Sequence, residues 1–116
     1  MLYRVERAAG VVGDLQLIFD HLTAAYLTFG EPLSEAQRHA AERIDSIQDA
    51  MLTLGRMPHQ GTLRLELGPA VRSVTKARAV FYFEVDDDQL RVRILAVFFG
   101  GQDHTRHMLQ RSLAAR

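Results

Sequence analysis

Cysteine is absent from the 116-residue chain, and tryptophan is absent as well. Without a thiol the protein forms no disulfide, has no cysteine nucleophile and offers no cysteine ligand to zinc. The lack of cysteine suits a reducing compartment, so we expect the protein in the cytoplasm. The remaining composition, with 47% hydrophobic and 24% charged residues, is ordinary for a globular protein.

Long hydrophobic stretches are missing too. No apolar run approaches the roughly 20 residues that a membrane-spanning helix needs, so we expect no membrane association. The first ten residues, MLYRVERAAG, lack the apolar core of a secretory signal peptide. A chain of 116 residues is long enough for one substantial core, and we expect residues 1–116 to form a single domain.

The chain has no excess of either charge. Lys and Arg total 14, Asp and Glu total 14, and the formal net charge is zero. A protein that grips nucleic acid by itself usually carries a clear basic excess, so the balance disfavours direct nucleic-acid binding. A locally basic face remains open, because thirteen of the fourteen basic residues are arginine, which favours planar recognition of carboxylate or phosphate.

Hydrophobic periodicity predicts a first helix from Val12 to Phe29. Leu17 and Leu27 lie off its apolar stripe, and we interpret them either as ordinary exposed leucines or as a second contact surface. The stripe itself follows the three-and-four spacing of a helix with one buried face. It comprises Leu15, Ile18, Phe19, Leu22, Tyr26 and Phe29.

A second helix is predicted to begin after the Gly-Glu-Pro break at 30–32 and to end near Leu54. Ser34 and Gln37 have the spacing of a capping box, and Gly55 is expected to be the C-cap. The short connection predicts an antiparallel hairpin with the first helix. The expected contact seam consists of Ala36, Ala40, Ile44, Ile47, Met51 and Leu54.

After Gly61 the hydrophobic period changes from 3.6 to 2, which indicates strands. Extended segments are predicted at 61–67 and 71–75, and a strand at 79–85 is rich in aromatic and β-branched residues. The run DDDQ at 86–89 predicts a hairpin turn. An alternating segment at 2–7 predicts one more strand at the start of the chain.

The stretch 90–103, LRVRILAVFFGGQD, predicts the strand around which the sheet is built. Leu90, Val92 and Ile94 alternate with arginine, but the run that follows is apolar at every position up to Phe99. A strand that is apolar on both sides is covered on both faces, so we expect this strand at the centre of the sheet. A short helix with Met108 and Leu109 facing inward is expected to follow the double glycine.

These segments give the order β-α-α-β-β-β-α. The strands from 61 onward form a meander, so we expect a mainly antiparallel sheet. A helical hairpin that packs on one face of such a sheet makes an α+β protein of two layers.

Few of the chain's polar residues suggest catalysis. Gly100-Gly101 is followed by neither Lys-Ser nor Lys-Thr, so it does not form a phosphate-binding P-loop, and we expect no cofactor. His104 and His107 lie close together on the last predicted helix, where the main interpretation is a solvated helix start. A general acid or base is the alternative role for them. We expect no metal site, because three ligands within one helical turn do not converge on one ion.

Arginines on outward positions of the predicted strands form the main candidate binding surface. One interpretation is a solvated face balanced by acids such as Glu66 and Glu84, and the other is a basic patch for an anionic partner. Apolar side chains on the second face of the 90–103 strand are candidates for the same partner. The candidate partner-binding residues are Arg64, Arg72, Arg78, Arg91, Arg93, Leu95, Val97 and Phe99.

The order and spacing of four segments resemble the RelE/ParE superfamily of bacterial toxins, and the ParE (plasmid stabilisation) branch most closely. The resemblance covers almost the whole chain and implies a RelE/ParE-like fold. Its segments are 57–61 (MPHQG), 65–73 (LELGPAVRS), 80–85 (VFYFEV) and 94–103 (ILAVFFGGQD). The last segment corresponds to a family pattern that typically reads Ile-Leu-Arg-Val-Leu-His-Gly-Arg-Arg-Asp.

The departures from that pattern bear on activity. The family arginine is Ala96 here, the family histidine is Phe99, and the two basic loop residues are Gly101 and Gln102. RelE-type members cut messenger RNA in the ribosome with such basic groups, which stabilise the charge that builds on the phosphate. The resemblance therefore implies no RNase site of the usual kind, and only His104 and His107 are substitutes if the protein is an RNase.

ParE-type members match the chain better. The resemblance implies the toxin of a type II toxin–antitoxin module, a non-enzymatic protein that inhibits DNA gyrase. It also implies a complex with a ParD-like antitoxin, through which alone the toxin would reach DNA. An acidic, apolar antitoxin segment would suit both the arginines and the apolar strand face. The alternatives are a RelE-like messenger RNA endonuclease and a decayed toxin that acts only as a binding module.

Overall fold

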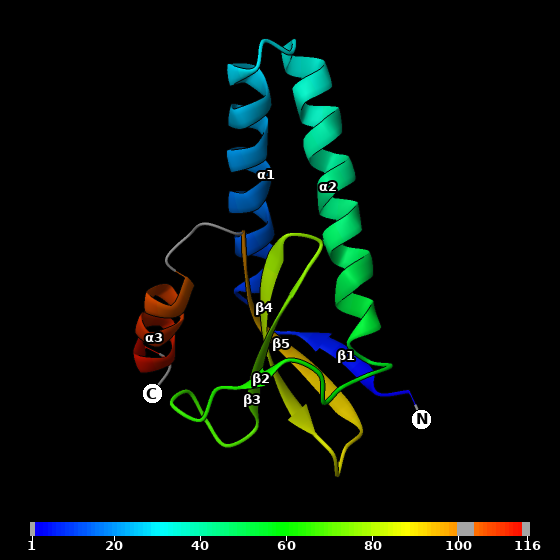
Figure 1. The fold of residues 1–116 in the computed structure, drawn as a ribbon, viewed down its shortest axis with the longest axis vertical. Helices are drawn as coiled ribbons and strands as arrows, with labels where there is room; N and C mark the ends of the chain where they lie inside the picture. Colours follow the sequence, from blue (N-terminus) through cyan, green and yellow to red (C-terminus); the bar gives the residue numbers. More distant parts are fainter. Residues whose placement is uncertain (1, 100–103, 115–116) are drawn as a thin grey trace.

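The computed structural model describes residues 2–99 and 104–114, and it confirms an α+β architecture with a helical hairpin on a sheet (Figure 1). The predicted order is right except that four strands, and not three, follow the hairpin, because each of the four predicted extended segments forms a strand of its own. The elements are β1 (Arg4–Arg7), α1 (Val11–Thr28), α2 (Leu33–Thr53), β2 (Thr62–Leu63), β3 (Val71–Lys76), β4 (Ala79–Asp86), β5 (Arg91–Phe99) and α3 (His104–Ala114).

The five strands form one sheet in the order β1-β5-β4-β3-β2. β1 runs parallel to β5, and the other neighbouring pairs are antiparallel, as the meander predicts. β5 has a strand on each side, yet β4 and not β5 is the middle strand, so the prediction of a central 90–103 strand is wrong. Leu90 has a positive φ of 51° and belongs to the preceding turn, and residues 100–103 lie outside the described part of the chain.

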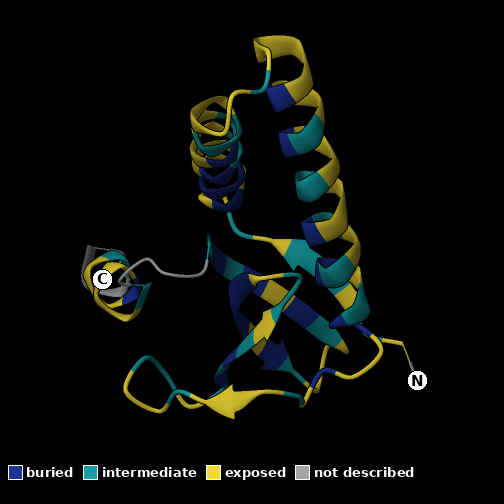
Figure 2. Cartoon of the chain, turned by 45° about the horizontal axis from the view of Figure 1, so that its top comes forward, coloured by how far each residue is buried: buried dark blue, intermediate teal, exposed yellow. Residues whose placement is uncertain are grey.

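The helical hairpin covers one face of the sheet with the expected seam. Ala36, Ala40, Ile47, Met51 and Leu54 are fully buried, and Ile44 is partly buried against the same core. The core also takes Leu15, Ile18 and Leu22 from α1 and Phe81, Phe83, Val92 and Ile94 from the strands. The far half of the hairpin extends beyond the sheet, and burial there is confined to the surfaces where the helices meet (Figure 2).

Phe29 corrects the predicted stripe of the first helix. Phe29 is 82% exposed, because it follows the last residue of α1 at the far end of the hairpin, where no strand lies beneath it (Figure 1). Leu17 is 66% exposed and Leu27 is 42% exposed, in agreement with their position off the stripe.

A β-bulge interrupts the alternation of faces within the apolar run of β5. Tyr82 lies opposite Ala96, but the next residue of β4, Phe83, lies opposite Ile94, so Leu95 is the extra residue. The bulge reverses the alternation, and both Ile94 and Val97 therefore belong to the core under the helices. The run is apolar at every position because both faces are covered there: Val97 and Phe99 pack in the core under the hairpin, and Ala96 and Phe98 pack in a smaller core under α3.

The capping predictions for α2 are wrong. The helix begins at Leu33 after Pro32, with no side-chain cap, and Leu54 rather than Gly55 is the C-cap. Gly55 instead accepts a hydrogen bond from the backbone of Tyr3, and a Cβ at this position would collide with the Tyr3 carbonyl oxygen. This glycine therefore allows the end of α2 to approach the chain just before β1.

Two further elements are shorter or less buried than predicted. The 61–67 strand is reduced to Thr62–Leu63, because a turn closed by a bond from the Leu67 N–H to the Arg64 carbonyl follows it. In α3, Met108 is buried as expected, but Leu109 is 38% exposed. No helix in the described residues is both long enough and apolar enough to cross a bilayer.

Candidate partner-binding surfaces

The sheet face opposite the hairpin, here called the second face, carries a polar row across two strands. Ser73 of β3 lies directly opposite Tyr82 of β4. The Nε of Arg64 donates a 2.8 Å hydrogen bond to the Ser73 hydroxyl, and the Tyr82 hydroxyl lies 2.7 Å from Nδ1 of His104. The row therefore joins the segment after β2 to α3 through two strands of the sheet.

Helix α3 covers part of this row with apolar and aromatic contacts. Met108 packs with Tyr82, Ala96 and Phe98 in a second, smaller core. The ring of His107 stacks on Phe98 with centroids 6.1 Å apart. Both histidines therefore contact sheet aromatics. His107 is nevertheless exposed, so the expectation of a solvated helix start fails only for the half-buried His104. Tyr82 is only 1% exposed, so its hydroxyl does not face solvent.

A side-chain network fastens α3 to the open edge of β5. β1 ends at Arg7, so beyond Ile94 the edge of β5 has no strand neighbour on that side. The buried carboxylate of Asp14 accepts the Val97 N–H at 3.0 Å and pairs with the Arg111 Nη1 at 2.7 Å. Arg111 also donates to the Leu95 carbonyl at 2.8 Å. Asp14 lies in the first turn of α1, and the sequence carries no local signal for its role in this network.

A hollow of about 310 Å³ opens on the second face between α3 and the loop before β3. Arg93, Glu84 and Arg111 contribute its charged groups. Arg93 is exposed and lies opposite Glu84 in the β4–β5 register. The apolar lining is provided by Ala8, Leu67, Val71, Leu95 and Met108. The hollow can accommodate a segment that has both apolar and acidic side chains.

The predicted arginine cluster is only partly formed. The strand register places Arg64, Arg91 and Arg93 on the second face, with Arg91 held 3.5 Å from carboxylates of both Glu6 and Asp86. Arg72 lies on the opposite face, where its guanidinium donates to the His59 carbonyl.

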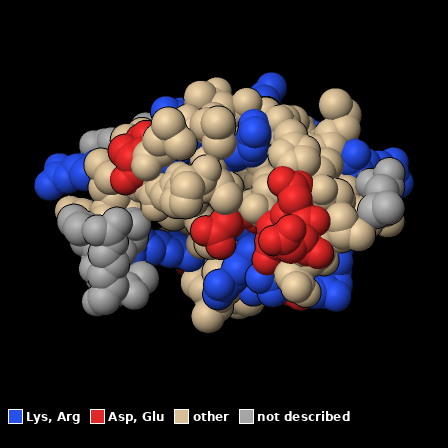
Figure 3. Space-filling model, turned by 90° about the horizontal axis from the view of Figure 1, so that it is seen from below, with Lys and Arg blue, Asp and Glu red and all other residues tan. Residues whose placement is uncertain are grey.

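The remaining candidate arginine, Arg78, lies in the exposed turn between β3 and β4, away from the others. At the end of the molecule opposite the connection between α1 and α2, basic and acidic side chains lie side by side and do not form a uniform basic patch (Figure 3).

The three apolar candidates do not share one face. Val97 is buried in the core beneath the helices, and Phe99 packs against that same core. Only Leu95 packs against the smaller core on the second face. The expectation that Leu95, Val97 and Phe99 form one partner surface is therefore wrong, and the bulge at Leu95 is the physical reason.

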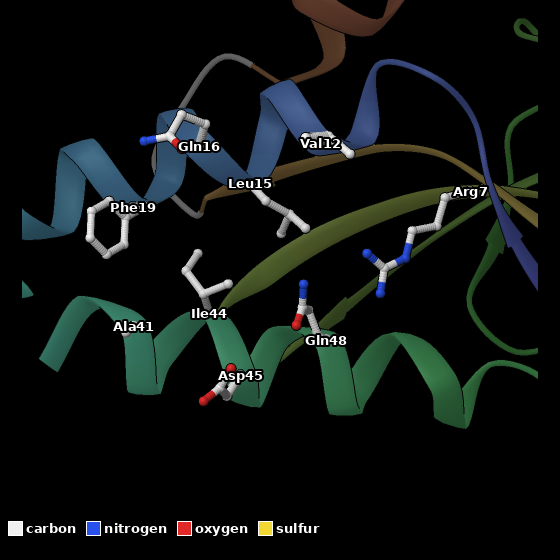
Figure 4. A pocket seen from close by; sticks show the side chains of 9 residues that line it. All are labelled: Arg7, Val12, Leu15, Gln16, Phe19, Ala41, Ile44, Asp45 and Gln48. Carbon is white, nitrogen blue, oxygen red and sulfur yellow. The ribbon is translucent and has the colours of Figure 1, made fainter. Parts of the chain in front are cut away.

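A groove that sequence reasoning missed runs between the two hairpin helices beside the end of β1. Figure 4 shows that Leu15 and Ile44 point toward one another across it and that Arg7 and Gln48 lie at one end. The groove has a volume of about 300 Å³, and Phe19 is part of its apolar lining. Because its apolar residues come from two helices, the signal was hidden within patterns that also predict the core.

An exposed cluster joins three segments at the β4–β5 turn. Tyr3 donates a 2.6 Å hydrogen bond to Oδ1 of Asp87, and Nε2 of His59 lies 2.8 Å from the same oxygen. The Tyr3 hydroxyl, followed by His59 and Arg72, lowers the pKa of Asp87, and the hydrogen bond to Asp87 raises the pKa of Tyr3. The acidic run forms the turn as predicted, and this one carboxylate also anchors the start of the chain. No group of three or more metal-ligating side chains is found within residues 2–99 and 104–114.

The sequence matches no protein-family model and no curated protein. Solved structures do match. A chain of the chromosomal ParDE toxin–antitoxin system of P. aeruginosa has a TM-score of 0.64 and 19% identity, over 84% of this chain and 96% of that one. A chain of the RelBE2 toxin–antitoxin complex of Mycobacterium tuberculosis has a TM-score of 0.54 and 22% identity, over 85% and 99%.

A third similar structure is an E. coli RelE toxin, in the free state and with two arginines replaced by alanine. Its TM-score is 0.59 at 9% identity, over 96% of this chain and 98% of that one. At these identities the likeness shows the fold, which is the RelE/ParE-like fold that the sequence segments imply. Both toxin types occur among these structures, so the activity has to be argued from the residues of this chain.

Proposed function

We propose that the chain is the toxin of a type II toxin–antitoxin module and that, like ParE toxins, it inhibits DNA gyrase without cutting RNA. The proposal that the protein is not an enzyme rests on one residue of the second face, Ala96. Ala96 stands where the family pattern has an arginine, and it is fully buried beneath α3 with Tyr82 and Met108. Cleavage of RNA requires a donor or cation at the phosphate, and this position supplies an apolar contact instead.

The proposed partner in the resting state is a ParD-like antitoxin with an acidic, apolar segment, in a cytoplasmic hetero-oligomer. The hollow on the second face supports this partner, because Arg93 lies at its surface and Leu67, Leu95 and Met108 line it. An acidic side chain near Arg93 would form a charge-assisted hydrogen bond, and neighbouring apolar side chains would be buried. Contact with DNA would come through the antitoxin, in keeping with the zero net charge of this chain.

A RelE-like endonuclease is the second candidate, and one observation favours it. The Tyr82 hydroxyl and His104 Nδ1 form a 2.7 Å pair, and Arg64 lies in the same polar row through Ser73. A histidine paired with a phenol can transfer protons in phosphoryl transfer, and an arginine can bind the phosphate. Because Tyr82 is 1% exposed, this chemistry requires α3 to move from the sheet. A decayed toxin that retains only antitoxin binding is the third candidate.

Induced expression in a bacterial host without antitoxin separates the three. We would score growth, reporter-plasmid supercoiling and the integrity of messenger RNA. Growth arrest with disturbed supercoiling and intact RNA is the expected result. Arrest with normal supercoiling and rapid RNA loss would favour the endonuclease. Normal growth with confirmed soluble protein would contradict both and leave the binding module.

A further inference from the structure

The far end of the helical hairpin presents apolar side chains to solvent. Leu27 in the last turn of α1 is 42% exposed, Phe29 in the connection is 82% exposed, and Leu33 at the start of α2 is 55% exposed. These three residues are here called the hairpin tip. The hairpin carries the tip away from the sheet, so the tip is a projection and not part of the groove or hollow described above (Figures 1 and 2).

The backbone of the tip is held by local hydrogen bonds. The Phe29 N–H is bonded to the carbonyls of Ala25 and Tyr26, and the Gly30 N–H is bonded to the Leu27 carbonyl. Gly30 has a φ of 93°, a left-handed conformation that glycine adopts without strain. A further bond runs from the Glu31 N–H to the Tyr26 carbonyl. Phe29 is therefore displayed on an ordered turn, which lowers the entropy that binding would otherwise cost.

The charges around the tip argue against two classes of partner. Between residues 21 and 37 the sequence contains Glu31 and Glu35 but neither lysine nor arginine. The next residue, Arg38, is a cation, but its guanidinium is paired with Glu42. A tip with so little unpaired positive charge attracts phosphates weakly, so nucleic acid and anionic membrane are both disfavoured. The side chain of Glu31 is paired with His39, and Glu35 is exposed in the first turn of α2. The complementary partner is a protein with a basic rim.

The size of the tip argues against a second copy of this chain. From their exposed fractions the three side chains present roughly 300 Å², about the size of the largest apolar patch on a typical monomer. Specific stable interfaces bury at least about 1,200 Å² in total, so two convex tips in contact would fall far short. A small projection of this kind is bound stably when a partner surrounds it with a concave pocket.

We propose that the hairpin tip is the surface by which the protein engages its target, and that Phe29 enters an apolar, basic-rimmed pocket on that target protein. This inference rests on the proposed function, in which the target is DNA gyrase. It assigns target binding to the end of the hairpin and antitoxin binding to the sheet, so the two surfaces are separate.

The test uses the full chain with Phe29→Ser and Leu33→Ser combined, and Leu17→Ser as the matched control. Leu17 is 66% exposed on α1 but lies away from the tip, so its replacement removes a comparable apolar group. Each protein is expressed without antitoxin to score growth arrest, and binding of the purified protein to purified gyrase is measured. Circular dichroism and thermal unfolding verify the fold, which we expect all variants to retain because these side chains are mostly exposed.

The expected result is loss of growth arrest and at least tenfold weaker gyrase binding in the tip variant, with the Leu17→Ser protein like wild type. Equal arrest by the tip variant and wild type would overturn the inference and leave the proposed function standing. Growth arrest by the wild-type protein without gyrase binding would overturn gyrase as the proposed target. If the tip variant then lost that arrest, the result would still support the hairpin tip as the target-binding surface. A wild-type protein that neither arrests growth nor binds gyrase would overturn both.

Discussion

The guanidinium of Arg111 in the last helix pairs with the carboxylate of Asp14 in the first helix at 2.7 Å, over the open edge of β5. Gly10 leaves room for this approach, because a Cβ at that position would require the guanidinium to shift. The same carboxylate accepts the Val97 N–H, and the same guanidinium binds the Leu95 carbonyl. Two side chains therefore form hydrogen bonds to the backbone of this part of β5, as β1 does to the first half of the strand.

Replacing Asp14 by Asn should lower the free energy of unfolding by about 1–3 kcal/mol. The substitution removes the ion pair to a largely buried carboxylate and leaves the Arg111 guanidinium without its counter-charge. Urea denaturation followed by circular dichroism measures the change. Asp20→Asn is the matched control, because Asp20 is exposed on the same helix, where it accepts a hydrogen bond from Gln16. Equal stability of the two variants would show that the network contributes little.

Alanine at two glycines should have opposite effects. A Cβ at Gly13 has open space around it within helix α1, so Gly13→Ala should stabilise the protein by about 0.5–1 kcal/mol through helix propensity. A Cβ at Gly55 would collide with the Tyr3 carbonyl oxygen, so Gly55→Ala should be destabilising. Thermal unfolding of both variants checks the signs. A stabilising Gly55→Ala would mean that the end of α2 and the start of the chain separate without cost.

The Tyr3–Asp87 bond should make stability depend on pH at both extremes. The pKa of Asp87 is lowered, so its contribution is present above the ordinary value of 3.8 and is lost as pH falls through the lowered pKa. The pKa of Tyr3 is raised, so its contribution is present below 10.0 and is lost as pH rises through the raised pKa.

Tyr3→Phe should therefore weaken the pH dependence of unfolding in the acid range below 3.8 and in the alkaline range above 10.0. Chemical denaturation at a series of pH values measures it. Asp88→Asn, in the same exposed turn, is the control and should leave the profile close to that of wild type. An unchanged profile for Tyr3→Phe would show that the bond does not persist in solution.

Arg93→Glu should weaken antitoxin binding at least tenfold if the hollow on the second face receives an acidic segment. The reversal places a carboxylate next to Glu84 and repels the proposed partner. Arg78→Glu is the matched control, since Arg78 lies in the β3–β4 turn and does not line the hollow. Titration calorimetry with the proposed antitoxin measures both. Similar losses for both variants would indicate long-range attraction instead of a defined site.

His104→Ala should leave growth arrest intact if the protein acts on gyrase. The imidazole contacts Tyr82, so its removal affects packing on the second face and the proposed endonuclease, but not the hairpin tip. Growth and RNA integrity after induction are the measurements. Loss of arrest in a variant that remains folded, together with loss of RNA cleavage present in wild type, would reverse the order of the two candidate functions.

Periodicity predicted the helices and the seam between them, because each pattern there depends only on neighbouring residues. It failed at Phe29, whose spacing continues the buried stripe although the sheet does not extend beneath it. The capping-box motif of Ser34 and Gln37 was misleading as well, because the helix begins at Leu33. Local patterns state which face of an element is apolar, but not how far its neighbour reaches.

The candidate site was harder to predict, because it depends on register. One extra residue, Leu95, transfers Val97 from the expected partner surface to the core. The pairing of Tyr82 with His104 and that of Asp14 with Arg111 join residues far apart in the sequence, and neither has a local signal. The arginines of the second face were recognised, but their distribution over two faces and a turn follows from strand pairing alone.

The parallel pairing of β1 with β5 places Arg4 beside Arg91. Strand β1 therefore cannot join the sheet until β5 has been synthesised. During translation the ribosome releases β1 and both hairpin helices long before β4 and β5, which supply much of the floor of their core. A nascent or prematurely terminated chain therefore has no sheet for the hairpin to pack on. If the protein is a toxin, harm therefore begins only after β4 and β5 have been synthesised.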